Sequence, residues 1–376
     1  MTVLLTGATG FLGSRVAHAL LTTRDESVIA LGRGTPAHFR GRVLDALKAH
    51  GEDVAEAGHP ARLRCVSGDV TEPWLGLPPA LYARIAHEVD AVWHCAGDIA
   101  LTGERERLFR VNVHGTARIL DFMELTAAHC RLVHLSTMAV AGARPGGRVT
   151  ESELSDACGF ETHYDASKFE AEKAVRQWAD RYRRPVVVLR PGIVANDRPQ
   201  SGDRAGHPLS VLGSMVEAVA RGGAPGIPAQ RPHGTQVRLR LAASPDAALN
   251  IVPDRYATET MVRIGHDADH DGGGGARTFH VVHGQNTTVK DLFTVLEQQY
   301  PGLRIECVTG DVQDATEAER HIAAHLTGFL SYCRHQRTYD RSHALAATPP
   351  LEEPAPIDAA FLRGALGFTA HAGMPV

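Results

Sequence analysis

Short apolar runs and longer amphipathic stretches alternate along the first half of the chain. Six runs rich in valine, isoleucine or leucine are expected to be buried strands: residues 3–5, 28–31, 63–66, 91–94, 132–135 and 186–189. The longest helical patterns lie at 105–125 and 164–181. Because strands that alternate with helices form right-handed crossovers, the pattern predicts an α/β protein with a Rossmann-type, doubly wound parallel sheet.

After residue 195 the pattern becomes irregular, with loop-like stretches at 196–208 and 222–234. The segments 251–262 and 278–282 again resemble ordered elements. We therefore expect an NADP-binding Rossmann core over residues 1–195 and a smaller, mainly substrate-binding or lid region over 196–376, with some segments returning to the core. The glycine-rich stretch 271–276 is expected to be a flexible surface loop.

A glycine-rich turn lies between the first apolar run and the first helical pattern. At this place backbone amides and the positive end of a helix can bind a pyrophosphate. The turn is therefore interpreted as the main nucleotide-binding segment, with a purely structural turn as the alternative. Its expected cofactor-binding residues are Gly7, Thr9, Gly10, Phe11, Leu12 and Gly13.

Arg33 follows the second run, where NAD enzymes often have an acidic residue for the ribose hydroxyls. Its cation favours a 2′-phosphate, so NADPH is predicted rather than NADH. Arg42 is expected to add a second contact, with Arg40 as its competitor; the alternative for each is a solvated surface side chain. The turns after the next two runs, Asp69-Val70 and Ala96-Gly97, are expected to flank the cofactor unless they are ordinary turns.

Tyr164 and Lys168 are four residues apart and therefore share one face of a helix. A nearby ammonium and a positively charged nicotinamide would lower the pKa of the Tyr164 phenol and make it a proton donor near neutrality. Thr137, directly after the fifth run, could share oxyanion charge with it. Asn112 is expected to support a water or a carbonyl beside Lys168. By itself a YxxxK pair is more often a surface feature of a helix.

Seven motifs occur in a characteristic order: TGATGFLG, GDV, HCAG, NVHGT, HLSTMAV, YDASK and LRPGIV. In this order they resemble the extended short-chain dehydrogenase/reductase family. The resemblance implies a Rossmann-type core, a C-terminal substrate region, catalytic roles for Thr137, Tyr164 and Lys168, and cofactor contacts from Lys168 and Tyr164. The LRPGIV motif adds four expected cofactor contacts: Pro191, Gly192, Ile193 and Val194.

Residues 68–97 and 190–202 resemble more narrowly the thioester reductase and fatty acyl reductase, or male-sterility-type, branch. That branch usually continues after RPG with GDS-x-TG, whereas this chain has Ala195-Asn196-Asp197-Arg198. The resemblance implies NADPH-dependent reduction of a carrier- or CoA-bound acyl thioester to an aldehyde, or onward to an alcohol. An acyl or peptidyl carrier protein is expected to dock around residues 196–210.

Three other functions remain open. A ketone or alcohol oxidoreductase would use the same catalytic residues. A sugar epimerase or dehydratase would need retained NAD⁺, which Arg33 disfavours, and a non-catalytic NADP sensor would not need Thr137, Tyr164 and Lys168. The chain contains no GxxxxGK[ST] sequence, so acyl activation with ATP is expected to occur elsewhere.

Charge and composition exclude several classes of protein. A net charge of −4 and a pI near 6.6 are unlike the strongly basic faces that bind nucleic acid. The six cysteines form no CxxC pair, so no zinc site or disulfide framework is predicted, and a cytoplasmic location is expected. No secretion signal and no membrane span are expected.

Two further segments invite functional interpretations. The histidines and aspartates of 266–271 could hold a metal, but the adjoining glycines favour a mobile polar loop. Residues 329–332 and 337–340 could close over a substrate or dock the C-terminal part on the core, and docking is preferred.

Overall fold

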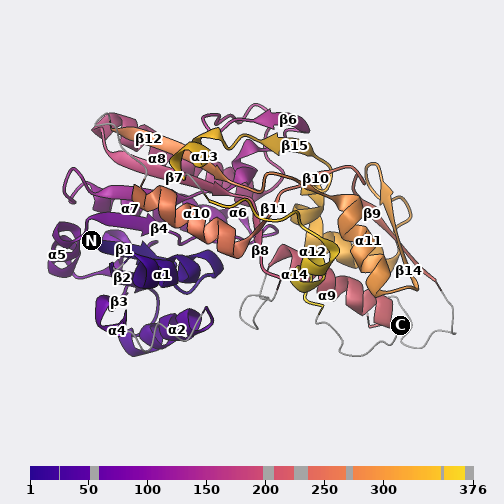
Figure 1. Ribbon diagram of the computed structural model, residues 1–376, viewed down its shortest axis with the longest axis horizontal. Helices are drawn as coiled ribbons and strands as arrows, with labels where there is room; N and C mark the ends of the chain where they lie inside the picture. The colour runs from indigo at the N-terminus through magenta and orange to yellow at the C-terminus, as the bar shows by residue number, and fades with distance from the viewer. Residues whose placement is uncertain are drawn as a thin grey trace.

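A seven-stranded parallel sheet forms the centre of the computed structural model, which describes residues 1–24, 26–50, 59–197, 207–223, 236–267, 274–348 and 351–368 (Figure 1). Every neighbouring pair is parallel. In spatial order the strands are β12 (Gly275–Val281), β7 (Pro185–Pro191), β5 (Arg131–Leu135), β4 (Ala91–His94), β1 (Thr2–Thr6), β2 (Ser27–Gly32) and β3 (Leu63–Ser67). The expected doubly wound fold is confirmed.

Helices cover both faces of the sheet. One face is covered by α1 (Phe11–Thr23), α2 (Pro36–Lys48), α10 (Asp254–Asp267) and α13 (Ser342–Ala347). The other is covered by α5 (Pro79–Glu88), α7 (Gly115–Met123) and α8 (His163–Tyr182). Because successive strand side chains point to opposite faces, Leu5 packs in the first cluster and Leu4 in the second. The five inner strands are thus largely buried on both sides, which explains their continuous apolar sequences, whereas Arg64 of the edge strand β3 is exposed.

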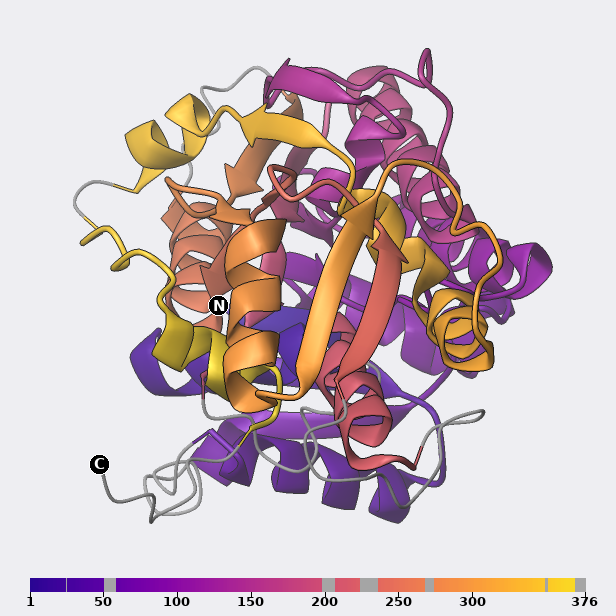
Figure 2. The same ribbon diagram turned by 90° about the vertical axis from the view of Figure 1, so that its right-hand side faces the viewer.

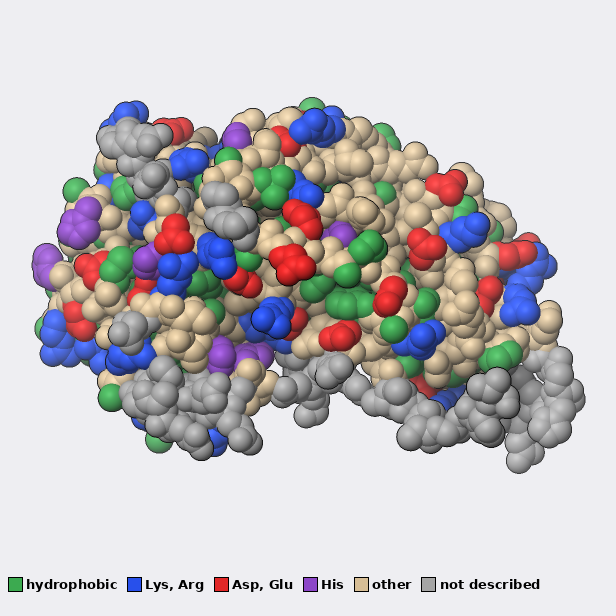
Figure 3. Space-filling model, viewed as in Figure 1, with side chains coloured by type: hydrophobic (Ala, Val, Ile, Leu, Met, Phe, Trp, Pro, Cys, Tyr) green, Lys and Arg blue, Asp and Glu red, His purple; other side chains and the backbone are tan. Residues whose placement is uncertain are grey.

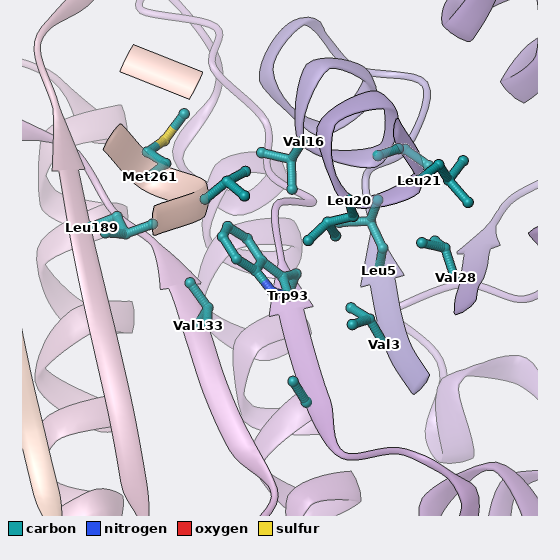
Figure 4. Close-up of a cluster of buried hydrophobic side chains, with 14 of the residues drawn as sticks. Val3, Leu5, Val16, Leu20, Leu21, Val28, Trp93, Val133, Leu189 and Met261 are labelled. Atoms are coloured by element: carbon teal, nitrogen blue, oxygen red, sulfur yellow. The ribbon is translucent and has the colours of Figure 1, made fainter. Parts of the chain in front are cut away.

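Figure 4 shows how distant segments meet in the cluster on the first face. Leu20 of α1 and Met261 of α10 lie over Trp93 and Leu189 of the sheet. Gly265 of α10 lies so close to Trp93 that a β-carbon there would be 2.3 Å from the indole ring. The expected division at residue 195 remains a prediction, but α10 and β12 pack together with the strands that precede it.

The expected long helix at 105–125 is interrupted. It consists of α6 (Arg105–Phe109), a π-helical turn at Arg110–His114 and α7. Single π-helical turns inside helices are often found at functional sites. The remaining short elements before α8 are α4 (His59–Arg62), η1 (Pro73–Gly76) and η3 (Met138–Ala141).

The region to the right in Figure 1, which faces the viewer in Figure 2, has its own apolar cluster. It contains α9 (Pro208–Arg221), β9 (Val237–Ala242), α11 (Val289–Gln299), β14 (Leu303–Val308), α12 (Glu317–Tyr332) and α14 (Ala359–Ala365). β9 and β14 pair in parallel. The short strands β10 (Ala248–Leu249) and β13 (Thr287–Thr288) pair beside it.

Two small parallel pairs connect this region to the large sheet. β8 (Ile193–Ala195) pairs with β11 (Ile251–Pro253), and β6 (Gly146–Val149) pairs with β15 (Gln336–Tyr339). The expected loop at 271–276 needs a correction: residues 271–273 lie outside the described residues, and Gly275 and Ala276 begin β12, where backbone pairing holds them.

The face of the molecule in Figure 3 carries acidic and basic side chains interspersed with one another (Figure 3). The described part of this face shows no wide region of one sign. Among the described residues, no helix combines the length and apolar character needed to cross a membrane.

Candidate active site

The turn from β1 to α1 forms a cradle that only glycines can make. Gly7 has a φ of +77°, and a β-carbon there would lie 2.7 Å from the backbone nitrogen of Ala96. At Gly13 a β-carbon would lie 2.1 Å from the carbonyl oxygen of Gly7. The backbone therefore leaves open the space in front of the N-terminus of α1, where a cofactor pyrophosphate fits.

A cavity of about 380 Å³ extends from this cradle toward the ends of β2 and β3. Arg33 and Arg42 line it, and Arg42 Nη2 donates to the Arg33 carbonyl oxygen at 3.0 Å. Arg40 donates instead to the Leu63 carbonyl oxygen at 3.4 Å and does not line the cavity. Of the two competitors, Arg42 is thus the one placed beside Arg33.

Four other expected cofactor residues line this cavity: Asp69, Val70, Ala96 and Gly97. Asp69 Oδ1 accepts hydrogen bonds from both the backbone nitrogen and the hydroxyl of Thr71, each at 2.9 Å. The carboxylate therefore holds its own turn in place, and the Ala96 nitrogen is held by the Thr6 hydroxyl at 3.2 Å.

A second cavity, of about 550 Å³, shares Thr9, Gly10 and Gly97 with the first and so continues from it. Thr137, Tyr164 and Lys168 line it together. The other predicted residues at this cavity are Phe11, Leu12, Gly13, Pro191, Gly192, Ile193 and Val194. Residues predicted from six of the seven motifs thus surround one continuous space at the carboxyl ends of the strands, where open α/β sheets bind ligands.

The Tyr164 phenol and the Thr137 hydroxyl line the same cavity. Burial raises the pKa of the Tyr164 phenol, and its interaction with the Thr137 side chain opposes that rise. Burial thus outweighs the lowering expected from Lys168, and the combined effect of Lys168 and a nicotinamide stays a prediction. The Lys168 ammonium donates instead to the Leu135 carbonyl oxygen at 2.6 Å.

Lys168 is 6% exposed, and burial lowers its pKa to about 8 while the Glu172 carboxylate opposes the change. Glu172 is itself held by Arg190, whose Nη2 lies 2.7 Å from it, and by the Ser136 hydroxyl at 2.6 Å. Charge-assisted bonds to Arg190 keep the pKa of Glu172 low in spite of burial. This buried network fixes Ser136, the residue directly before Thr137.

Asn112 lies in the π-helical turn and does not line either cavity. Its Oδ1 accepts from the Asp98 nitrogen at 2.8 Å, and its Nδ2 donates to the Asp98 carbonyl oxygen and to the Ser167 hydroxyl, both at 2.9 Å. It thus ties the loop after β4 to α8. The expected carbonyl partner is that of Asp98, and the link to Lys168 stays a prediction.

Sequence reasoning missed much of the cavity wall. Tyr332 of α12 and Arg337 and Tyr339 of β15 line the same space as Thr137. The preference for docking alone was therefore wrong, since α12 packs in the C-terminal cluster through Phe329 and also bounds the cavity. The only signal was the aromatic and basic character of these two segments. Further apolar wall residues are Ile99, Leu101, Met138 and Leu249.

Other expectations fall partly outside the described residues. Within the 266–271 segment, His266 bonds to Glu26 at 3.1 Å, Asp267 bonds to Arg24 at 2.7 Å, and residues 268–271 are not described. No group of three metal-ligating side chains occurs in the described part of the chain. Of the segment expected to dock a carrier protein, residues 198–206 are not described.

The chain matches a model of the male sterility protein family over residues 5–243. It is 31% identical over 230 residues to an isonitrile lipopeptide synthase from Streptomyces coeruleorubidus, covering 57% of this chain and 15% of that protein. To a carboxylic acid reductase from Segniliparus rugosus it is 30% identical over 220 residues, covering 54% and 18%. The chain thus spans less than a fifth of the length of either relative.

Among solved structures, the chain is similar to the terminal R domain from the myxalamid PKS-NRPS biosynthetic pathway. The TM-score is 0.76 at 24% identity, and the match covers 99% of this chain and 91% of that domain. The likeness therefore includes the C-terminal region as well as the sheet.

Proposed function

We propose that this chain, which belongs to the male sterility protein family of oxidoreductases, reduces an acyl thioester to an aldehyde with NADPH. The family has the extended short-chain dehydrogenase/reductase fold. The acyl group would be carried by a carrier protein or by coenzyme A. The relative named a carboxylic acid reductase and the likeness to a terminal R domain support this substrate class.

The observation that carries the proposal is the single cavity that joins the glycine cradle to Thr137, Tyr164 and Lys168. A bound nicotinamide cofactor supplies hydride for carbonyl reduction. Thr137 and Tyr164, which line the same cavity, would present two hydroxyls to a substrate oxygen. Because burial keeps the Tyr164 phenol protonated at neutral pH, it can donate a proton to the oxyanion as charge develops.

Lys168 would stabilise the arrangement of Thr137 and Tyr164. Its ammonium is fixed against the Leu135 carbonyl oxygen two residues before Thr137, and because Lys168 lines the same cavity, it would bind the ribose hydroxyls of the cofactor. The apolar walls formed by Leu101, Met138 and Phe329 would exclude water from the acyl group. A thioester suits this site because its carbonyl is electrophilic. Hydride and proton addition would give a hemithioacetal, which collapses to the aldehyde as the C–S bond breaks and the hydroxyl proton passes to the leaving thiolate.

The test is to incubate purified protein and NADPH with acyl-carrier, acyl-CoA and ketone substrates and to identify the products by mass. We expect NADPH oxidation with a thioester, together with release of free thiol and formation of aldehyde, or of alcohol after a second reduction. If no thioester reacts while a simple ketone is reduced efficiently, the thioester proposal is wrong and ketone reduction replaces it.

Tyr164→Phe should lower kcat by about two to four orders of magnitude, because it removes only the proton-donating hydroxyl. Its dissociation constant for NADPH should change little. The matched control is Tyr182→Phe, at the exposed end of the same helix. Near-normal turnover by Tyr164→Phe would show that another group donates the proton.

A further inference from the structure

Arg337 is a buried cation in the wall of the catalytic cavity. It lies on β15, where residues 337 and 339 share one face of the strand, and both line the cavity that holds Thr137 and Tyr164. Arg337 is only 4% exposed. Its Nη1 donates to the Gly142 carbonyl oxygen at 2.6 Å. The guanidinium is thus held in place by a neutral backbone group.

The carboxylates around Arg337 have other neighbours. Asp165 accepts the Tyr332 hydroxyl at 2.5 Å, Asp340 pairs with Arg148 at 2.6 Å, and Glu161 Oε1 lies 2.9 Å from His335 Nε2. Burial raises the pKa of Asp165. Because Arg337 carries the opposite charge, its attraction moderates this rise. Within the described chain, no carboxylate forms a hydrogen-bonded ion pair with Arg337.

A guanidinium has five N–H donors in a planar fork that suits a carboxylate. In the described residues only the Nη1 bond uses this capacity, so Nε and Nη2 have no hydrogen-bond partner there. A buried cation is costly unless it is paired. The neighbouring hydroxyl of Tyr339 lines the same cavity, while Leu101, Met138 and Phe329 give the rest of the wall an apolar character. Arg337 is therefore a polar anchor in a largely apolar space.

We propose that Arg337 binds a carboxylate on the acyl group of the substrate, so that the preferred thioester is a half-thioester of a dicarboxylic acid. This inference rests on the proposed reduction of thioesters and specifies the acyl group that this site accepts. Thr137 and Tyr164 would hold the reacting carbonyl while Arg337 holds the far carboxylate, and the distance between them would select the chain length.

The first test uses the unmodified protein. CoA half-thioesters of dicarboxylic acids of increasing length are compared with their ω-methyl esters, with NADPH saturating. We expect at least one free acid to exceed its ester in kcat/KM by about tenfold or more, mainly through a lower KM, since a charge-assisted bidentate bond is lost in the ester. Equal kcat/KM values for acid and ester at every length would overturn the proposal.

The second test uses Arg337→Met, which keeps the length of the side chain and removes the charge. We expect KM for the preferred free acid to rise about tenfold or more, and the ratio of kcat/KM between the free acid and its ester to fall to about one. Arg337→Lys should restore part of the preference. The control is Arg334→Met, an exposed arginine near the start of the same strand. An equal loss for acid and ester would mean that Arg337 acts only on the structure.

A binding measurement separates failure of this inference from failure of the proposed function. If the unmodified protein reduces no thioester, the proposed function is wrong, and thermal denaturation with NADPH and free dicarboxylates then tests the anchor alone. A rise in Tm that is lost in Arg337→Met but kept in Arg334→Met would support a carboxylate site. Equal shifts in both variants, or no shift in any protein, would contradict it.

Discussion

Arg33 lies in the turn before α2 and Arg40 within α2, yet only one of the two lines the cavity beside β2 and β3. Arg33 lines the cofactor cavity, and Arg40 donates to the Leu63 carbonyl oxygen. Arg33→Asp should weaken NADPH binding by about 2 kcal/mol or more, roughly 30-fold, because a repelling charge replaces a partner of the 2′-phosphate. NADH binding should change by less than about threefold. Fluorescence titration of both cofactors measures the difference.

Arg40→Asp is the matched control, since it makes the same change of charge outside the cavity. It should weaken the two cofactors equally and only slightly. Equal weakening of NADPH and NADH by Arg33→Asp would remove the basis for a 2′-phosphate contact and for the preference for NADPH.

The positions of some residues of the site could be predicted from the sequence, and those of others could not. Tyr164 and Lys168 share a helix, so their spacing alone puts them together, and Thr137 follows a strand whose end is fixed by the sheet. Arg337 reaches the same cavity only because β15 pairs with β6, almost two hundred residues earlier in the chain. No local pattern encodes that pairing, so the anchor could not be predicted.

At the scale of elements, the contact between α8 and α12 joins the catalytic helix to the cavity wall. Tyr332 of α12 donates to Asp165 of α8, and burial raises the pKa of Asp165 to about 6 from its usual 3.8. A carboxyl with a raised pKa in the folded protein lowers stability once it ionises. This cost is absent below about pH 4 and complete above about pH 6.

Asp165→Asn should therefore gain stability relative to the unmodified protein as pH rises from 4 to 7. A shift of about 2 units corresponds to a change of about 3 kcal/mol in the free energy of unfolding, an upper value because asparagine keeps only part of the bonding. Chemical denaturation at several pH values measures it. Asp180→Asn, on the exposed side of α8, should give a constant difference. A constant difference for Asp165→Asn as well would contradict the raised pKa.

Sequence periodicity predicted the large elements well and their interruptions poorly. The helix at 163–182 begins and ends within one residue of the expected 164–181 because Thr162 caps it and Arg183 takes a left-handed conformation after it. The π-helical turn inside the expected helix 105–125 leaves no trace in the apolar pattern. In the structure it is recognised by the hydrogen bond from the Gly115 nitrogen to the Arg110 carbonyl oxygen, five residues earlier.

At the scale of the molecule, the last strand of the sheet comes from a segment that follows α9, the first helix of the C-terminal region. β12 is the seventh strand, and Met261 of α10 lies in the same cluster as Leu20 and Trp93. A fragment of residues 1–195 would expose the edge of β7 and the apolar face under α10. It should bind a hydrophobic dye and unfold without a cooperative transition, as circular dichroism would record. A fragment that unfolds cooperatively and binds NADPH would show instead that residues 1–195 form an independent domain.

The order of elements could be predicted for this core only as far as β7. Up to that strand, successive strands of the sheet are also neighbours in it, except at the step from β3 to β4, which returns from the edge to the other side of β1 as doubly wound sheets do. β12 is separated from β7 by α9, β9 and α10, and its apolar segment resembles any other short strand. Its place at the edge depends on the packing of α10 against α1, which is a property of the whole fold.

The π-helical turn at Arg110–His114 also has a consequence for insertions and deletions. A π-helical turn holds one more residue than an α-helical turn, so it is equivalent to a single-residue insertion that the helix has absorbed. Deleting one residue there would restore a regular α-helix and rotate everything before it by about 100° relative to α7. Arg107 and Arg110, which line the cofactor cavity, would then face elsewhere, and Asn112 could no longer hold Asp98. In an alignment of homologues, a gap in this stretch would therefore matter more than a substitution. A homologue shorter by one residue would have a different cavity even if every side chain were retained.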